Sequence, residues 1–273
     1  MLAFICGLKQ AGGPCTVLCY SAAVKPLVSL DDPARIETLR ALLGRKQFLR
    51  RYYLEIYRRY AECLSRCPLE GKALELGTGA GFAKQIVPEL ITSDTIAYAG
   101  VDQVVDAAAL PFADRSLRFI CMLNVFHHLP DVEAFLREAD RCLELGGRIL
   151  IVDQYPGWLS SILFKYFHHE PFRPDARDWR FDSTGPLSGA NGALAFLVFE
   201  RDRARFEQLH PNLRLQLYRP HSPLRYWVSG GLKSWTLLPG WAFPLATAVD
   251  RLFIALSRRF GSFVDIELVK TAP

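Results

Sequence analysis

The pattern of apolar and polar positions divides the first half of the chain into helical and extended stretches. Helical patterns cover about 31–45, 48–65, 81–88 and 132–143. Short apolar runs bounded by turn residues lie at 72–76, 90–96, 101–105, 117–124 and 148–153. Such runs are typical of buried strands, so their order predicts a mostly parallel sheet with helical crossovers. No helix is predicted between the second and third of these strands.

The second half of the chain breaks this alternation. Residues 155–212 mix aromatic side chains with polar groups and glycine turns, a composition that suits a cap over a pocket. Residues 213–218 have the pattern of a sixth strand, and 264–270 that of a final antiparallel strand. Residues 1–30 have no sustained period, so we predict a disordered leader there.

Composition favours a packed core and argues against nucleic-acid binding. Half of the 273 residues are hydrophobic and 22% are charged, which is ample for a core. The formal net charge of +5 is mild, and much of the excess lies in 45–59, where basic and aromatic residues are interleaved. Either a solvated helix face or a surface for nucleic acid or anionic lipid accounts for this stretch, and no recognised nucleic-acid module accompanies it. We therefore expect no nucleic-acid partner.

Cysteine usage and hydropathy bear on where the protein works. The seven cysteines include no C-x-x-C pair, which indicates reduced thiols, a cytoplasmic protein and no zinc site. No run of 18 uncharged apolar residues is present, so no membrane-spanning helix is predicted. The apolar segment 235–260 ends in Arg258-Arg259. Either a peripheral membrane contact or a packed helix that supports the cap accounts for this segment.

The prediction of function depends on the turn after the first strand. Glu75 is followed by Gly77, Gly79 and Gly81, which gives the pattern E-x-G-x-G-x-G. Glycine lets the backbone approach a ligand closely, and a helix that begins there presents unpaired N–H groups to an anion. The dinucleotide fingerprint G-x-G-x-x-G would need glycine at 82. Because Phe82 stands there, a nicotinamide enzyme is disfavoured.

Three motifs together resemble the class I S-adenosylmethionine (SAM) methyltransferases. The glycine turn resembles their first motif. Residues 106–114, DAAALPFAD, resemble the D-x-x-x-L-P-F-x-D segment of the methyltransferase type 11 group, and 125–130, VFHHLP, resemble its H-H-x-P turn. At 144–147 the chain has ELGG where the group has K-P-G-G. The resemblance implies an α/β, Rossmann-like, mostly parallel seven-stranded sheet with helices on both faces, an antiparallel last strand and a cap inserted before the sixth strand.

The resemblance also implies SAM as the cofactor and assigns residues to its parts. The glycine turn would hold the methionine carboxylate, and Glu75 suits the methionine amino group. Asp106 and Ala107 would meet the adenine ring. The strand that ends at Asn124 would run beside the methionine and the transferred methyl group.

Two acids fit the position that binds the ribose. In nucleotide-binding α/β units this acid lies about 20 residues after the glycine turn. Asp94 lies 17 residues after Gly77 and Asp102 lies 25 residues after it. We favour Asp94.

Candidate catalytic residues are sought among groups that could take a proton. Methyl transfer demands alignment of donor and acceptor, and a base only where the acceptor loses a proton. His168, His169 and Glu170 lie in the predicted cap and are the candidates. His127 and His128 fit better as structural or cofactor-lining groups. No metal is predicted, because adjacent histidines point different ways and no matching carboxylate spacing accompanies them.

The chain divides into five predicted segments. They are a leader (1–30), N-terminal helices (31–70), a SAM-binding core (71–154), a cap that contacts the acceptor (155–212), and closing strands with an apolar helix (213–273). The function we expect is SAM-dependent methyl transfer to a small-molecule or lipid-linked acceptor. The alternative is a non-catalytic scaffold of the same fold that binds a partner through its cap.

Overall fold

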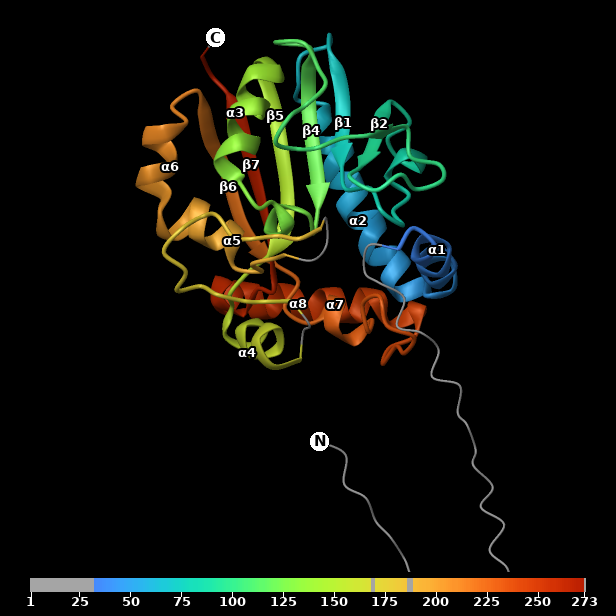
Figure 1. Cartoon of the computed structure of the whole chain (residues 1–273). Coiled ribbons are helices and arrows are strands. Elements are labelled where there is room, and N and C mark those ends of the chain that lie inside the picture. Colours follow the sequence, from blue (N-terminus) through green and yellow to red (C-terminus); the bar gives the residue numbers. More distant parts are fainter. Residues whose placement is uncertain (1–31, 168–169, 186–188, 273) are drawn as a thin grey trace, which may run out of the picture.

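The fold is built on one seven-stranded sheet with the strand order β3-β2-β1-β4-β5-β7-β6 (Figure 1). The structure is a computed structural model that describes residues 32–167, 170–185 and 189–272. The strands are β1 (Lys72–Leu76), β2 (Leu90–Asp94), β3 (Gln103–Val104), β4 (Leu117–Leu123), β5 (Leu143–Gln154), β6 (Leu213–His221) and β7 (Phe263–Lys270). Strand β7 runs antiparallel to β5 and β6, and the other neighbouring pairs are parallel. The predicted fold class is confirmed.

Helices cover both faces of this sheet and the end where its parallel strands finish (Figure 1). They are α1 (Arg35–Arg45), α2 (Gln47–Leu64), α3 (Val132–Cys142), α4 (Trp158–Phe167), α5 (Leu194–Phe196), α6 (Arg203–Leu209), α7 (Arg225–Val228) and α8 (Phe243–Leu256). Alternate strand residues point to opposite faces. On one face Leu74 and Ile151 pack with α3, α5 and α6. On the other face Ala73 and Val152 pack with α2 and with Phe243 of α8.

The predicted helix over 81–88 is wrong. Only a 3₁₀ turn, Ala83–Gln85, lies between β1 and β2. Thirteen residues separate these strands, and Pro88 interrupts the helical pattern after a single turn. The face that such a helix would cover is occupied by α2, whose Tyr57 packs edge-on against Phe82 at 4.9 Å between ring centroids. The predicted lack of a helix between β2 and β3 is confirmed.

Strand β5 begins five residues earlier than predicted. Helix α3 passes directly into it at Leu143, which pairs with Leu117, and the next paired residues are Phe119 and Arg148. The extra residues bulge out at Gly146, whose φ of 81° is the left-handed conformation that glycine tolerates. The ELGG sequence is therefore an irregular opening of the strand.

The predicted cap contains parts with different surroundings. Leu194, Val198 and Phe206 are buried in the same core as α3. Ser183–Gly185 line the cavity described below. The division of the chain into segments stays a prediction, and the predicted leader lies outside the described residues. Within the described ranges, no helix combines the length and apolarity needed to cross a membrane.

Candidate functional site

A cavity of about 750 Å³ opens where β1, β2 and β4 end. The carboxyl ends of parallel strands are where open α/β sheets bind ligands. The glycine turn, Glu75, Asp94, Asp106, Ala107 and Asn124 all line this cavity. The structure thus brings together every cofactor-binding residue that the sequence predicted. Their assignment to parts of SAM stays a prediction.

The glycine turn has no room for a side chain at Gly77 or at Gly81. Gly77 and Gly79 have φ angles of 65° and 49°, in the left-handed region. A Cβ on Gly77 would lie 2.3 Å from a methyl group of Val125, and one on Gly81 would lie 2.7 Å from the hydroxyl of Tyr57. The turn is tied to β2, because the Thr78 amide donates to the Ser93 carbonyl at 2.8 Å. Since no α-helix follows the turn, it offers no helix N-terminus to an anion. Its contribution to binding is that a ligand can approach the backbone closely.

Two acids, the buried Glu75 and the half-buried Asp94, lie at one end of the cavity. Burial raises the pKa of Glu75 to about 7, and Asp94 adds to this rise, while a hydrogen bond from Thr78 opposes it. The Thr78 hydroxyl donates to Glu75 at 2.8 Å, and the Gly79 amide donates to Asp94 at 3.0 Å. Burial also raises the pKa of Asp94. Carboxyl groups with raised pKa values are stabilised as carboxylates by a positively charged ligand.

Asp106 and Ala107 lie beside this acidic end. The Asp94 carbonyl accepts a hydrogen bond from the Val105 amide at 2.9 Å, which fixes the chain just before Asp106. One carboxylate oxygen of Asp106 accepts from the Ala108 amide at 2.8 Å. Ala107 is buried and belongs to the core around β1 and β4. A small apolar residue beside an anchored carboxylate leaves space for a flat ring with a hydrogen-bond donor.

Asn124 turns the chain at the end of β4. Its φ of 55° is left-handed, a conformation that asparagine adopts more readily than most residues. Its amide donates to the Val152 carbonyl at 2.8 Å. The side-chain oxygen of Asn124 is buried and has no hydrogen-bond partner among the described residues. An unsatisfied acceptor in a cavity wall is a position where a ligand can donate.

His127 is buried between two carboxylates. Its Nδ1 lies 2.6 Å from Asp153, and its Nε2 lies 3.2 Å from Glu170. Burial opposes the charged imidazolium, but the two carboxylates together raise the pKa of His127 to about 10. His127 therefore carries a proton on both nitrogens at neutral pH.

Glu170 joins His127 to the cavity wall. Its other oxygen lies 3.4 Å from Nε2 of His128, which lines the cavity. Burial opposes ionisation of Glu170, but the two histidines hold its pKa below the ordinary value. The sequence predicted Glu170 as catalytic and His127-His128 as lining groups, and the structure places the three together. His168 and His169, the other two candidates, lie outside the described residues.

The same three residues bear on the prediction of no metal. Donor atoms of His127, His128 and Glu170 lie within 4.8 Å of one another, close enough to bind one ion. An imidazolium has no free lone pair, so the raised pKa of His127 disfavours a metal. The absence of a metal stays a prediction.

The N-terminal helices supply a wall of the cavity that the motifs do not contain. Ile36, Leu39 and Leu43 of α1 line it, with Tyr53 and Tyr57 of α2. The sequence predicted helices here, within 31–70, but did not place them at the cavity. Aromatic residues at helical spacing are usually core, so no local signal marked the tyrosines as cavity residues.

Comparison with known proteins links part of the chain to a family. Residues 84–151 match the model of a family described as a methyltransferase domain. This stretch therefore resembles a methyltransferase domain. The matched part of the methyltransferase domain includes Asp94, Asp106, Asn124 and the His127-His128 turn, and it begins after the glycine turn.

Individual relatives agree with the methyltransferase domain. The chain is 30% identical over 110 residues to the uncharacterized methyltransferase YcgJ of Bacillus subtilis (strain 168), a match that covers 33% of this chain and 44% of that protein. It is 38% identical over 63 residues to the uncharacterized protein YafE of Escherichia coli (strain K12), covering 20% of this chain and 30% of that protein. The chain thus spans less than half the length of these curated relatives.

A solved structure shares the fold. It is a methyltransferase in complex with the Haloferax volcanii Trm112 methyltransferase activator. The TM-score is 0.50 and the sequence identity 17%, and the match covers 87% of this chain and 98% of that one. At this identity the likeness concerns the fold alone.

Proposed function

We propose that this protein is a SAM-dependent methyltransferase that acts on a small-molecule or lipid-linked acceptor. The observation that carries the proposal is the glycine turn, in which Gly77 and Gly81 have no room for a side chain, beside the buried Glu75 and the half-buried Asp94. A ligand with positive charge and a close approach to the backbone fits this end of the cavity. When bound, SAM supplies a methyl group on a positively charged sulfur.

The residues that would hold SAM divide by chemistry. Glu75 as a carboxylate pairs with the methionine ammonium group. Asp94 accepts from the ribose hydroxyls with the lone pairs that Gly79 leaves free. Asp106 accepts from the exocyclic amine of adenine, and Ala107 leaves room for the ring. These roles follow from the family resemblance, and each of the four residues lines the cavity.

The acceptor side of the proposal rests on Glu170 and His128. Holding donor and acceptor in line can be worth about 7–11 kcal/mol, so positioning supplies most of the catalysis. Where the acceptor loses a proton, the candidate groups are Glu170 and His128, because His128 lines the cavity and its Nε2 lies 3.4 Å from Glu170. His168 and His169 keep their candidate roles as predictions.

The test is cofactor binding by a matched pair of glycine variants. Gly77→Ala places a methyl group against Val125 in a left-handed backbone, and we expect the affinity for SAM to fall by at least about 100-fold. Gly44→Ala is the control, because a Cβ on Gly44 meets nothing within 4 Å. Calorimetry measures both affinities, and circular dichroism checks both folds. Unchanged affinity in a folded Gly77→Ala variant would contradict the proposal.

Turnover separates the enzyme from the scaffold. Incubation of the protein with methyl-labelled SAM and a fractionated cell extract should label one product, whose identification names the acceptor. Binding of SAM without labelled product in any fraction would favour the non-catalytic alternative.

A further inference from the structure

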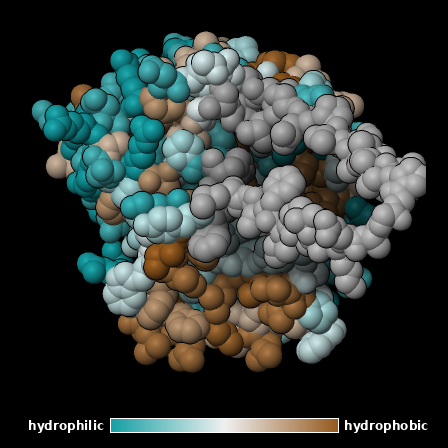
Figure 2. Space-filling view, turned by 60° about the horizontal axis from the view of Figure 1, so that its bottom comes forward, coloured by the Kyte–Doolittle hydropathy of each residue, from teal (hydrophilic) through white to brown (hydrophobic). Residues whose placement is uncertain are grey.

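Exposed apolar side chains gather at one end of the molecule. Of the fifteen large apolar residues that are exposed in the described part of the chain, eleven lie in α4, in α8 and in the segment before α8. These eleven define the α4–α8 surface: Trp158, Leu159, Ile162, Tyr166, Leu232, Trp235, Leu237, Trp241, Leu245, Leu252 and Leu256. Figure 2 shows hydrophobic residues gathered at this end. An apolar patch of this kind on a folded protein marks a site of interaction.

The two helices form one continuous surface. Trp158 of α4 packs edge-on against Phe260 at 5.0 Å between ring centroids, and Phe260 packs against Phe253 of α8 at 5.1 Å. Both helices lie along the end of the molecule where the strands finish (Figure 1). The patch is therefore one face, composed of segments more than 60 residues apart in sequence.

Helix α8 carries apolar side chains on its outward side and an acid on its inward side, the reverse of an ordinary surface helix. Leu245, Leu252 and Leu256 form a stripe on the outward side and are each more than 60% exposed. Asp250 points inward and is 2% exposed, close to the buried Ala246. A helix packed on a protein core normally turns its leucines inward and its acids outward. The outward stripe of α8 therefore lacks a partner within the described chain.

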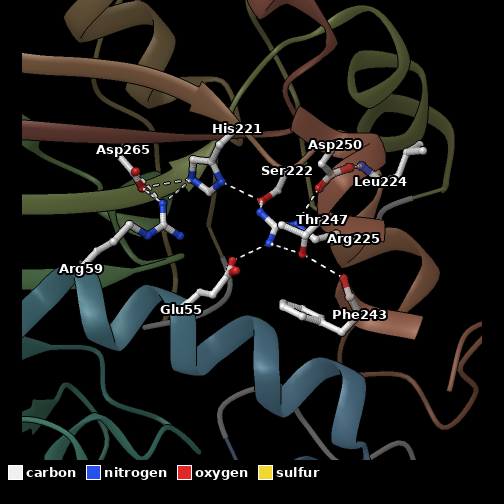
Figure 3. A network of polar contacts seen from close by, with 10 residues as sticks. All are labelled: Glu55, Arg59, His221, Ser222, Leu224, Arg225, Phe243, Thr247, Asp250 and Asp265. Carbon is white, nitrogen blue, oxygen red and sulfur yellow. Dashed lines mark hydrogen bonds and ion pairs between the residues drawn. The ribbon is translucent and has the colours of Figure 1, made fainter. Parts of the chain in front are cut away.

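A polar network holds α8 in this orientation (Figure 3). Asp250 accepts from the Arg225 guanidinium at 2.7 Å and from the Leu224 amide at 2.9 Å. Arg225 also pairs with Glu55 of α2 and donates to Thr247 at 3.2 Å. Because a buried aspartate must be paired, these contacts fix the inward side of α8 against α2 and α7. The apolar stripe cannot turn inward without breaking them.

The charges around the α4–α8 surface have one sign. Segments 157–167 and 226–261 contain five basic residues, all exposed: Lys165, Lys233, Arg251, Arg258 and Arg259. Their single acidic residue is the buried, paired Asp250. Protein surfaces that lie in a membrane interface typically combine leucine, isoleucine, Trp and Tyr side chains with basic residues.

We infer that the α4–α8 surface docks on a lipid bilayer that contains anionic lipids. Apolar side chains would enter the boundary between headgroups and acyl chains, and the five basic residues would meet the lipid headgroups. Leu232 belongs both to this surface and to the cavity wall, so the docked bilayer reaches the edge of the cavity. Delivery of a lipid-linked acceptor from the bilayer rests on the proposed function, but docking itself does not.

Vesicle sedimentation tests the inference with the full chain and without SAM. We expect the wild type to sediment with phosphatidylcholine vesicles that contain phosphatidylglycerol and to do so far less with phosphatidylcholine alone. Leu245→Glu with Leu252→Glu should lower the partition coefficient at least about tenfold. Arg258→Gln with Arg259→Gln should lower it about fivefold for each charge removed.

The matched control carries the same chemical change elsewhere. Leu69 and Leu145 are also exposed, and they lie where the strands begin, away from α4 and α8. Leu69→Glu with Leu145→Glu should sediment as the wild type does. No sedimentation of the wild type, equal loss in the control, or equal binding to both vesicle types would overturn the inference. Light scattering is the second measurement. A wild-type dimer that becomes a monomer on Leu245→Glu with Leu252→Glu, together with no vesicle binding, would also overturn the inference. The surface would then bind a second copy of the chain.

Discussion

At neutral pH the carboxyl group of Glu75 is divided between its two protonation states, because its pKa is raised to about 7. The ammonium group of SAM would pair only with the ionised form. We therefore expect the affinity for SAM to fall about fivefold between pH 7 and pH 6, as calorimetry would measure. Glu75→Gln should bind more weakly at both pH values and show no such change. An equal pH dependence in Glu75→Gln would assign the titration to another group.

Replacement of Glu75 should also stabilise the protein in the absence of a ligand. The folded protein binds the Glu75 proton more tightly than the unfolded chain, so the free energy of unfolding falls as pH rises from about 4.5 to 7. Glu75→Gln removes that loss, and its free energy of unfolding at pH 8 should exceed that of the wild type by up to about 3 kcal/mol. Urea unfolding measures the difference. Lower stability of the variant would show that the carboxylate is stabilised in the ligand-free state.

The His127–Glu170 contact leads to a prediction about metal removal. Asp153 and Glu170 raise the pKa of His127 and so oppose the loss of the proton that metal binding at its nitrogen would require. We expect dialysis against EDTA to leave methyl transfer unchanged within about a factor of two. Loss of activity restored by a divalent ion would assign His127, His128 and Glu170 as metal ligands instead.

Residues carried by local motifs were predictable, and residues that reach the site from elsewhere were not. Asp94 and Asp106 follow the strand ends that the apolar runs marked, so spacing alone placed them at one edge of the sheet. Tyr57 meets the glycine turn across more than twenty residues of intervening chain. Asp153 pairs with His127 from the end of β5. Such contacts depend on tertiary packing, which a periodic pattern does not encode.

At the scale of elements, the sequence predicted the order of the strands better than their connections. The cores of β1, β4 and β7 lie in buried runs of the predicted kind, whereas β3, predicted over 101–105, has only two residues and both are exposed. The connection between β1 and β2 was wrong because the pattern over 81–88 suits a helix, whereas α2 already covers that face. Packing against Tyr53 and Tyr57 decided the outcome over local propensity.

The polar network of Arg225, Asp250 and Glu55 joins α2, α7 and α8. It allows a prediction of how the loss of the Arg225 charge changes the free energy of unfolding. Arg225→Ala leaves Asp250 buried without its guanidinium partner and also breaks the pair with Glu55. We expect the free energy of unfolding to fall by about 3–5 kcal/mol in denaturant titrations. Arg203→Ala is the control, because its pair with Glu207 is about half exposed and should cost at most about 0.5 kcal/mol. Equal effects of the two substitutions would show that this network contributes little to the free energy of unfolding.

At the scale of the whole molecule, cofactor binding should be visible as thermal stabilisation. A ligand at 100 times its Kd adds about 2.7 kcal/mol to the free energy of unfolding. For a chain of this size we expect SAM at that concentration to raise Tm by roughly 5–10 °C. NADH should leave Tm unchanged, since Phe82 stands where a dinucleotide turn needs glycine. A shift with NADH and none with SAM would reverse the choice of cofactor.

The short link between β5 and α4 has a consequence for which acceptors could react. Strand β5 ends at Gln154, beside Asp153, and α4 begins at Trp158. Between them a Cβ on Gly157 would lie 2.0 Å from the Gly261 carbonyl, so the link is tightly packed. The His127–Asp153 pair therefore stands at a fixed depth behind the α4–α8 surface. With a bilayer on that surface, the distance between the lipid and the site would be fixed. Only an acceptor atom at that distance from the bilayer could then react.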